Sequence, residues 1–584
     1  MALHAKTLGE MALTAPERYS GVAIGFPRDG AWRELSYAEL GTAIRDTARG
    51  FVALGLEPGD RVALLAETRP EWTLADLALL AAGCVVVPVY HTNSPDECRH
   101  VIGHSGARAI VGEDAGQLEK VEAVRGDLPE LEHVVTIEDT GRAPTIEQIR
   151  ARADETDPDA LQQRQRGIGT DDVATIVYTS GTTGPPKGCM LTHGNFLATM
   201  HAYERQVDLR APFTLFMFLP LAHALARVVQ MVAFDVGGAL AFWSGDPRRL
   251  VDDVATARPT HFPSVPRVFE KIHARALGSS GARRRILEWA VGVGRRARAA
   301  ERNGGVSPLL RAQHAAADRL ALSKVRRLFG DRLELALTGA APIAVEVLEF
   351  LDACGVTVLE GYGMSETCAA ATLNPPDAPR FGTVGPALPG MNVEIADDGE
   401  ILLRGPNVFA GYYRDEEGTR AAMAGDAIRT GDLGELDAHG YLRITGRTKD
   451  IIITSSGKNV APTNLENALR ESRWISQAVV HGDNRPYLVA LLTLDADEAP
   501  ALADELGIAG DVGAMARDER VRAALQRVVD SANSRFARIE QIKRFDVLSE
   551  DFSQDAGELT PTMKVKRNVI EERYREAFAA LYDG

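Results

Sequence analysis

The stretch that decides the fold is YTSGTTGPPKG, at residues 178–188. It comes directly after an apolar segment, residues 173–179, that we expect to be a buried strand. Glycines let the backbone approach an anion closely, and hydroxyl groups donate hydrogen bonds to phosphate oxygens. The loop therefore predicts a polyphosphate site, to which the following residues contribute: Thr179, Ser180, Gly181, Thr182, Thr183 and Gly184.

This loop differs from the two common phosphate-binding motifs. A P-loop needs a glycine directly before its lysine and a hydroxyl after it, whereas Lys187 stands between Pro186 and Gly188. The spacing of the glycines does not match GxGxxG either. A surface loop rich in turn residues is the structural alternative, and the complete eleven-residue pattern disfavours it.

The chain on either side of this loop alternates between expected helices and strands. Capping boxes at residues 36–39 and 94–97 begin helices, and apolar strands are expected at 61–66, 84–90 and 107–111. This order predicts a parallel sheet with crossover helices. A polar stretch at 154–169 reads as a surface connection, and residues 271–329, rich in Arg, Ala and Leu, favour helices.

The pattern changes after Gly446. Strands are expected at 451–454, 476–481 and 487–494, and helices at 518–535 and 568–581. We therefore predict a large N-terminal α/β domain of mixed sheets and helices at 1–446 and a smaller, mobile α+β domain at 447–584.

Composition excludes several classes of protein. The 584 residues carry a formal net charge of −16, and no single basic run is long enough to reverse that locally, so we expect no nucleic-acid partner. Five cysteines without a CxxC pair argue against disulfides and zinc and favour a cytoplasmic location. The N-terminus resembles no secretory signal, and the most apolar run, 77–90, is too short to span a membrane.

An ordered series of further motifs follows the loop, and with it the sequence resembles the AMP-forming acyl-CoA synthetases, adenylation domains of peptide synthetases and luciferases. The resemblance covers nearly the whole chain and implies the adenylate-forming fold. The motifs are LPLAHALAR at 219–227, TGAAPI at 338–343, EGYGMSET at 360–367, TGDL at 430–433, GRTKD at 446–450, SGKNV at 456–460 and PTMKVKR at 561–567.

The resemblance implies the roles of the nucleotide-binding residues. Tyr362 would stack on adenine, Ser365 would contact phosphate, and Glu366 would hold Mg²⁺, a cation that prefers oxygen ligands. Asp432 would bind the ribose and Arg447 the ribose or phosphate. A helix-capping role is the alternative for Glu366, and a turn role for Asp432. The site also includes Glu360, Gly361 and Gly363, with Gly339, Ala340 and Ala341 beneath the adenine.

The resemblance also implies the catalytic groups. Lys564 would approach the substrate carboxylate and the α-phosphate, with Lys187 as a second candidate lysine and His223 at the mouth of the acyl pocket. Met563 stands where the family most often has glycine, and the nearby Lys566 and a solvated C-terminal charge remain alternatives for the lysine role. His223 could instead be a core histidine. The small domain would rotate at Lys449, and Gly457 would line the passage of CoA.

The expected reaction joins a fatty acid to CoA at the expense of ATP, through an acyl-adenylate. The segment PSVPRVFEKI at 263–272 and the helical insertion after it resemble the long-chain members. Two alternatives remain: a ligase that loads an unusual acid onto a carrier protein, and a non-catalytic nucleotide-binding sensor. Peripheral contact with a membrane is compatible with the sequence, which leaves the oligomeric state open.

Overall fold

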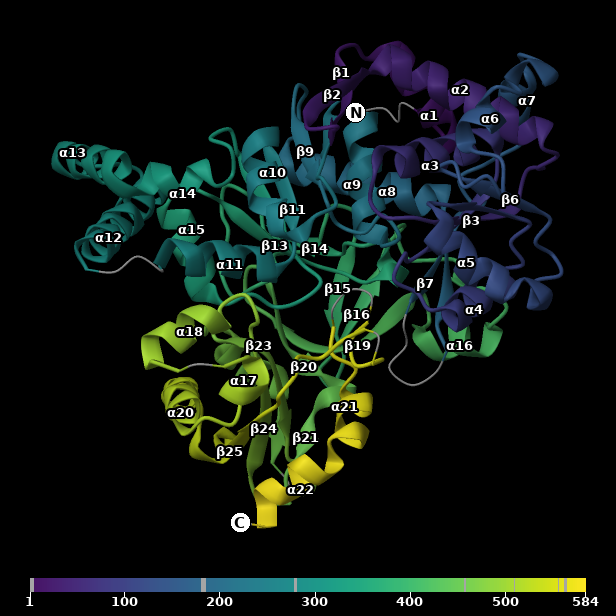
Figure 1. The fold of residues 1–584 in the computed structure, drawn as a ribbon. Coiled ribbons are helices and arrows are strands. Elements are labelled where there is room, and N and C mark those ends of the chain that lie inside the picture. Colours follow the sequence, from purple (N-terminus) through teal and green to yellow (C-terminus); the bar gives the residue numbers. More distant parts are fainter. Residues whose placement is uncertain are drawn as a thin grey trace.

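Three sheets form the large domain, and a smaller unit lies below it in Figure 1. The computed structural model describes residues 5–179, 185–277, 281–455, 458–508, 510–554, 556–560 and 564–583. Ser180 to Gly184 and Gly457, all predicted site residues, therefore lie outside the described residues.

The first sheet contains the strand that precedes the decisive loop. Its order is β17-β8-β7-β4-β3-β5-β6, and the strands from β7 to β6 are parallel, as the alternation predicted. The strands are β3 (Arg61–Leu65), β4 (Val85–Val89), β5 (Ala109–Gly112), β6 (His133–Thr136), β7 (Val173–Thr179), β8 (Lys187–Thr192) and β17 (Gly411–Tyr412).

The helices that cross over between these strands begin where their caps predict. Ser36 caps α2 and Ser94 caps α4, each in a reciprocal capping box with the glutamate three residues later. The polar stretch at 154–169, predicted to be a surface connection, contains α7, whose Leu161 is buried. The helices are α1 (Leu8–Arg18), α2 (Tyr37–Ala53), α3 (Pro70–Ala82), α4 (Pro95–Ser105), α5 (Ala115–Ala123), α6 (Ile146–Arg150), α7 (Ala160–Arg166) and α8 (His193–Val207).

The second sheet has the order β14-β13-β12-β11-β9-β10-β1-β2, and its edge hairpin β1–β2 comes from the N-terminus. An antiparallel sheet of β15, β16, β18, β19 and β20 follows in the sequence and ends the large domain. Neither was specified by the sequence analysis. The strands are β1 (Val22–Arg28), β2 (Ala31–Ser36), β9 (Thr214–Met217), β10 (Ala239–Phe242), β11 (His261–Ser264), β12 (Leu335–Thr338), β13 (Val358–Tyr362), β14 (Thr372–Leu373), β15 (Asn392–Ile395), β16 (Glu400–Arg404), β18 (Met423–Ala424), β19 (Ala427–Leu436) and β20 (Leu442–Arg447).

The stretch from 271 to 329 is helical, as its composition predicted. In Figure 1, α12 and α13 project from the side of the large domain. A π-helical turn, Asp318–Leu322, joins α13 to α14. The helices of this half of the domain are α9 (Ala224–Asp235), α10 (Leu250–Ala257), α11 (Pro266–Leu277), α12 (Ala282–Arg302), α13 (Pro308–Ala317), α14 (Ser323–Arg327), α15 (Val345–Ala353) and α16 (Glu416–Ala422).

The small domain has its own apolar core, which runs from Ile452 to Val547 and is built around the sheet β23-β24-β25. The helix predicted at 568–581 is interrupted at Tyr574, so it forms two short helices instead of one. The elements are β21 (Ile452–Ile453), β22 (Asn459–Val460), β23 (Ile475–His481), β24 (Leu488–Leu494), β25 (Ile542–Val547), α17 (Pro462–Arg470), α18 (Ala499–Leu506), α19 (Val512–Met515), α20 (Glu519–Asn533), α21 (Arg567–Arg573) and α22 (Arg575–Asp583).

Candidate functional site

The decisive loop connects the two strands of a β-hairpin. Thr179 of β7 pairs with Lys187 of β8, and Tyr178 pairs with Gly188. A Cβ atom at Gly188 would lie 2.7 Å from the Ile176 side chain, so this position tolerates only glycine without a local shift.

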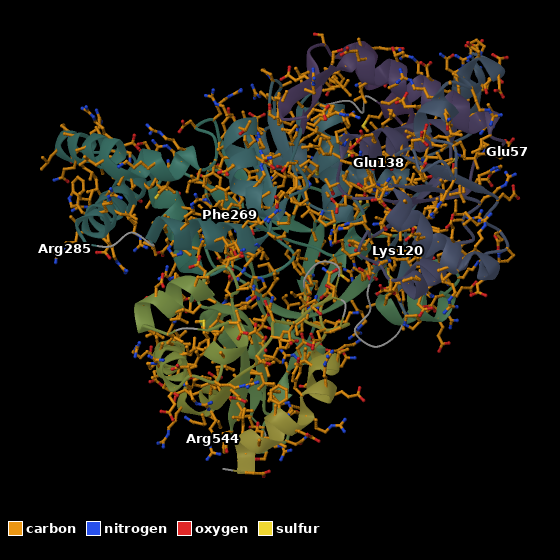
Figure 2. All side chains as sticks on the ribbon, in the orientation of Figure 1. Glu57, Lys120, Glu138, Phe269, Arg285 and Arg544 are labelled. Atoms are coloured by element: carbon orange, nitrogen blue, oxygen red, sulfur yellow. The ribbon has the colours of Figure 1, made fainter. Side chains whose placement is uncertain are left out.

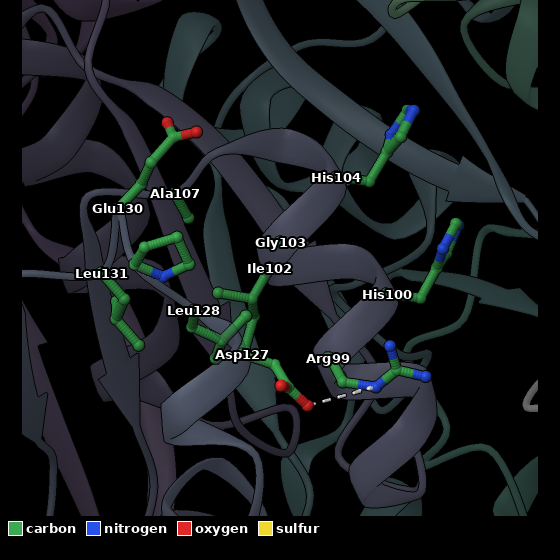
Figure 3. Close-up of a pocket in the computed structure, with 11 residues that line it drawn as sticks. Arg99, His100, Ile102, Gly103, His104, Ala107, Asp127, Leu128, Glu130 and Leu131 are labelled. Atoms are coloured by element: carbon green, nitrogen blue, oxygen red, sulfur yellow. Dashed lines mark ion pairs between the residues drawn. The ribbon is translucent and has the colours of Figure 1, made fainter.

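Helix α4 holds both sides of the hairpin. His100 Nε2 lies 2.8 Å from the Pro186 carbonyl oxygen, and His104 Nδ1 lies 2.8 Å from the Tyr178 hydroxyl. His100 and His104 are also among the residues that line a surface hollow, together with Ile102 and Leu128 (Figure 3). No predicted site residue lines that hollow.

Lys187 lies on the surface at the base of the hairpin. Its ammonium donates to Asp415 Oδ2 at 2.8 Å and stands 4.8 Å from the centre of the Tyr412 ring. The bond from Lys187 lowers the pKa of the Asp415 carboxyl, so this carboxyl is ionised at neutral pH.

Glu366 is buried in a short 3₁₀ turn, Ser365–Thr367, just beyond β13. The Tyr412 hydroxyl donates to Glu366 Oε1 at 2.7 Å. Burial and the Glu366 carboxylate raise the pKa of Tyr412, so the phenol keeps the proton that it donates. Sequence reasoning missed Tyr412 and Asp415, although GYYRD at 411–415 is a conspicuous aromatic and charged run.

Three of the motifs meet at Asp432, which is buried in β19. The Tyr362 hydroxyl donates to Asp432 Oδ2 at 2.6 Å, and Arg447 Nε donates to Oδ1 at 2.7 Å. The β19–β20 pairing places Asp432 directly opposite Arg447. The carboxylate is thus fixed in orientation by two donors.

The TGAAPI turn lies beside the first residues of EGYGMSET. Thr338 of β12 pairs with Glu360 of β13, and Ala340 follows in the left-handed region with φ of +67°. A Cβ atom on Gly339 would stand 3.1 Å from the Gly361 carbonyl oxygen. Ala340 and Ala341 are exposed, so the turn presents small side chains and backbone to the solvent.

Two further residues of EGYGMSET, Glu360 and Gly363, are constrained by packing and hydrogen bonding. Burial raises the pKa of Glu360 to about 8, and its carboxyl accepts a 3.3 Å hydrogen bond from the Gly382 amide. A Cβ atom at Gly363 would lie 2.3 Å from the Ala369 carbonyl oxygen, which excludes any side chain. These two positions therefore support the strand and turn that carry Tyr362 and Glu366.

His223 is the N-cap of α9. Its Nδ1 accepts a 3.2 Å hydrogen bond from the Leu225 amide, which fixes the orientation of the ring. Burial, together with the nearby Lys564 ammonium, lowers the pKa of His223 to about 4, so the imidazole is neutral at pH 7. The histidine has a structural partner and still lies within electrostatic reach of Lys564.

Lys564, from the small domain, lies near His223. Water reaches its side chain, but the surrounding protein and Arg447 lower the pKa of its ammonium, while Asp432 opposes them. Arg567, three residues on, donates to Glu466 Oε1 at 2.6 Å and to the Val480 carbonyl at 2.8 Å within the small domain. Lys564 therefore lies near an anchored segment and within electrostatic reach of Asp432, Arg447 and His223.

Ion pairs hold the small domain against α11. Lys271 Nζ lies 2.8 Å from Asp497 Oδ2, and Arg267 is bonded to Asp495. Arg535 lies 3.5 Å from Glu346 of α15. These contacts were not expected from the sequence, because they join residues about 190 to 230 positions apart.

The predicted hinge lies between the two domains. Lys449 is exposed in a 3₁₀ turn, Thr448–Asp450, which joins β20 of the large domain to β21 of the small one. Its position is compatible with a hinge.

The metal prediction rests on Glu366 alone. Among the described residues, the one group of three side chains whose ligand atoms could share an ion is His201, Glu204 and Asp235, which lie on α8 and α9. A single carboxylate still fits Mg²⁺, because this ion usually keeps several waters and binds substrate phosphates. The second oxygen of Glu366 is not engaged by Tyr412.

Comparison with known proteins agrees with this geometry. Residues 13–413 match the family model of the AMP-binding enzyme, and residues 449–584 match that of the AMP-binding enzyme C-terminal domain. The chain belongs to the AMP-binding enzyme family. In the described residues, no helix is both long and apolar enough to cross a membrane.

Relatives within the AMP-binding enzyme family extend over nearly the whole chain. The long-chain-fatty-acid–CoA ligase FadD15 of Mycobacterium tuberculosis is 39% identical over 562 residues, covering 95% of this chain and 93% of that protein. The long-chain-fatty-acid–CoA ligase ACSBG2 of Xenopus laevis is 33% identical and covers 96% of this chain and 81% of its own. ATP-bound MatB from Rhodopseudomonas palustris superposes with a TM-score of 0.72 at 25% identity, covering 98% of this chain and 99% of that one.

Proposed function

We propose that this AMP-binding enzyme is an acid–thiol ligase that activates a long-chain fatty acid with ATP to acyl-AMP and then transfers the acyl group to CoA. The products are acyl-CoA, AMP and pyrophosphate. The observation that carries the proposal is the meeting of Lys564 with Asp432, Arg447 and His223 at one place between the domains.

The arrangement suits the first half-reaction. Asp432 would accept from the ribose hydroxyls. Tyr362, whose hydroxyl is fixed on Asp432, ends the strand that pairs with the TGAAPI strand and would stack on adenine. Negative charge increases on the α-phosphate as the carboxylate attacks. An oriented cation such as Lys564 stabilises that charge, and such groups commonly contribute a factor of about 10² to 10³ in rate.

Mg²⁺, when bound, would neutralise phosphate charge and help pyrophosphate leave. Glu366 would hold it, since this carboxylate is buried and fixed by Tyr412. Lys187, at the base of the hairpin, would assist at the phosphates after exchanging Asp415 for the nucleotide.

The second half-reaction needs Lys564 to leave so that the thiol can reach the acyl carbonyl. We place the domain boundary at residues 446 and 447, and the separate core that begins at Ile452 supports it. Lys449 would act as the hinge. Gly457 would line the CoA passage, as the sequence resemblance implies. A cytoplasmic location belongs to the same proposal, and five free, buried cysteines support it.

The relatives favour a long-chain acid and CoA over an unusual acid and a carrier protein. A non-catalytic sensor is disfavoured because Glu366, Lys187 and Lys564 are all present. Each methylene buried in an apolar tunnel contributes up to about 0.8 kcal/mol, so kcat/KM should rise by several orders of magnitude from acetate to acids of about twelve to sixteen carbons.

The test is pyrophosphate release across a panel of acids, with and without CoA. We expect acid-dependent release that is greatest for long chains, and acyl-CoA formation only when CoA is present. A preference for acetate or an aromatic acid would contradict the substrate class. Release with no acid dependence would contradict the reaction itself.

A further inference from the structure

The helices α12, α13 and α14 form a basic projection, here called the arm and defined as residues 282–327. It carries twelve Lys and Arg residues and three Asp and Glu residues, in a chain whose net charge is −16. Along the sequence, no basic run is long enough to reverse the field locally. The fold does reverse it, because cations spread over three helices are gathered on one projection (Figure 1).

Most of these cations are not neutralised by the protein. Arg284 pairs with Glu288, and Arg295, Arg298 and Arg302 face Glu349 or Asp352 of α15. Within the described part of the chain, seven cations of the arm form no ion pair: Arg283, Arg285, Arg296, Arg311, Arg319, Lys324 and Arg327. Figure 2 shows Arg285 at the outer edge of the arm, away from the body of the protein.

The arm also exposes apolar side chains. Ile286, Trp289, Leu309 and Leu320 are 41%, 44%, 71% and 50% exposed. They are four of the eight large hydrophobic residues that are exposed in the described residues, although the arm is less than a tenth of the chain. Such a concentration indicates contact with something apolar.

The cations and the apolar groups share helix faces. On α12, Arg285, Trp289 and Arg296 are spaced by four and seven residues, which places them on one side of the helix. The opposite side, with Leu287 and Gly294, is buried against the domain. On the second helical segment, Leu309 and Leu320 are eleven residues apart, about three turns, and therefore point in a similar direction.

We propose that the arm is a docking surface for an anionic lipid bilayer, with Arg and Lys on the headgroup phosphates and Trp289 and its apolar neighbours in the interfacial region. Aromatic and aliphatic groups among basic residues on a helix face fit a membrane interface, where a ring has one apolar and one wet side. Nucleic acid would bind the basic side chains but would offer no apolar surface to Leu309 or Leu320. A second copy of this acidic chain would not bring a dense layer of phosphates.

Binding of the arm to a bilayer does not depend on the ligase reaction. Only the benefit of that binding, access to a membrane-dissolved acid, rests on the proposed function. Long-chain acids partition into bilayers, so an arm that rests on the bilayer would keep the enzyme where its substrate is concentrated. The contact is peripheral, because α12 has seven arginines and cannot span a membrane.

The experiment is sedimentation of the full-length protein with phosphatidylcholine vesicles that contain either no phosphatidylglycerol or about 30% of it, without ATP or CoA. The test variant is Arg285→Glu with Arg296→Glu. The matched control is Arg33→Glu with Arg527→Glu, since both of these arginines are exposed and form no ion pair within the described residues. Acyl-CoA formation from a water-soluble medium-chain acid checks that each variant is folded.

We expect wild type and control to bind the anionic vesicles equally, and binding to weaken as salt is raised. The arm variant should bind at least about 25-fold more weakly, from about fivefold for each cation removed. Tryptophan emission should shift to shorter wavelength on binding, and Trp289→Phe should bind but lose the shift.

Equal binding by the arm variant and the control would overturn the proposal, as would an emission shift that persists in Trp289→Phe. Preference for duplex DNA over the vesicles, or self-association that the arm variant abolishes, would also overturn it. Because the binding assay contains no ATP or CoA, a failed ligase assay would leave the vesicle result standing, and the reverse also holds.

Discussion

The two halves of the candidate site are held in place by different means. In the large domain, Asp432 is fixed by Tyr362 and Arg447, and Glu366 is fixed by Tyr412, all on strands and turns that pack on a common core. In the small domain, Lys564 lies within electrostatic reach of Asp432 and Arg447, and ion pairs such as Lys271–Asp497 join this domain to α11. In the large domain, core packing and buried hydrogen bonds keep the site residues in place throughout. The small domain is held by surface ion pairs, which are individually weak and can separate.

This comparison predicts the largest effect for Lys564→Ala. Adenylate formation should fall by a factor of at least about 10² to 10³, because the oriented cation is lost. Thioester formation from supplied acyl-adenylate should be largely spared, since Lys564 leaves the site before the thiol enters. The two half-reactions can be measured by pyrophosphate release and by acyl-CoA formation. Lys566→Ala is the control and should be mild, and equal loss of both steps would contradict the division of roles.

The second-largest effect is expected for Glu366→Gln. The adenylation rate should fall by a factor of about 10², and more Mg²⁺ should be required for half-maximal rate. Glutamine keeps an acceptor for the Tyr412 hydroxyl but removes the negative charge. Pyrophosphate release measured over a magnesium titration tests this. Glu394→Gln, on an exposed strand of the same domain, should leave the titration unchanged. An unaltered magnesium dependence in Glu366→Gln would remove Glu366 from the metal site.

A smaller effect is expected for Tyr362→Phe, which keeps the ring but leaves Asp432 with only one of its two donors. Loss of a hydrogen bond to a buried charge should raise KM for ATP about tenfold. Tyr441→Phe removes a 2.8 Å bond to the Ala378 carbonyl in the same domain and serves as the control. If both variants have the same KM, the Tyr362 hydroxyl does not orient the ribose acid.

The smallest effect should come from the domain contact. Lys271→Glu should slow adenylation about fivefold, because the reversed charge faces Asp497 across an exposed pair. Adding Asp497→Lys should restore the rate, and the thioester step should change little in either variant. Arg142→Glu disrupts a pair with Glu122 far from the contact and should have no effect. Failure of the double variant to recover would show that the ion pair does not position Lys564.

The sequence predicted the parallel sheet and the helices that begin at capping boxes, but not the contact between the two domains. Only the resemblance brought TGAAPI and EGYGMSET to one site; in the structure they follow the adjacent parallel strands β12 and β13. The capping boxes at Ser36 and Ser94 marked their helices. The contact of α11 with Asp495 and Asp497 has no local signal, because it depends on how two domains dock. Tyr412 was missed for the same reason, since only the β8–β17 pairing brings it to the hairpin. The division of the last helix at Tyr574 depends on packing that helix periodicity does not report.

The ion pairs on α11 also bear on solubility. Under the proposed function, the face that carries Arg267 and Lys271 is uncovered once in every turnover. An apolar contact would adhere more tightly, but it would present a sticky patch to other molecules each time the domains part. Charged side chains simply become hydrated when they separate. The enzyme can therefore expose this face repeatedly without risk of aggregation, and the affinity between its domains can be adjusted one charge at a time.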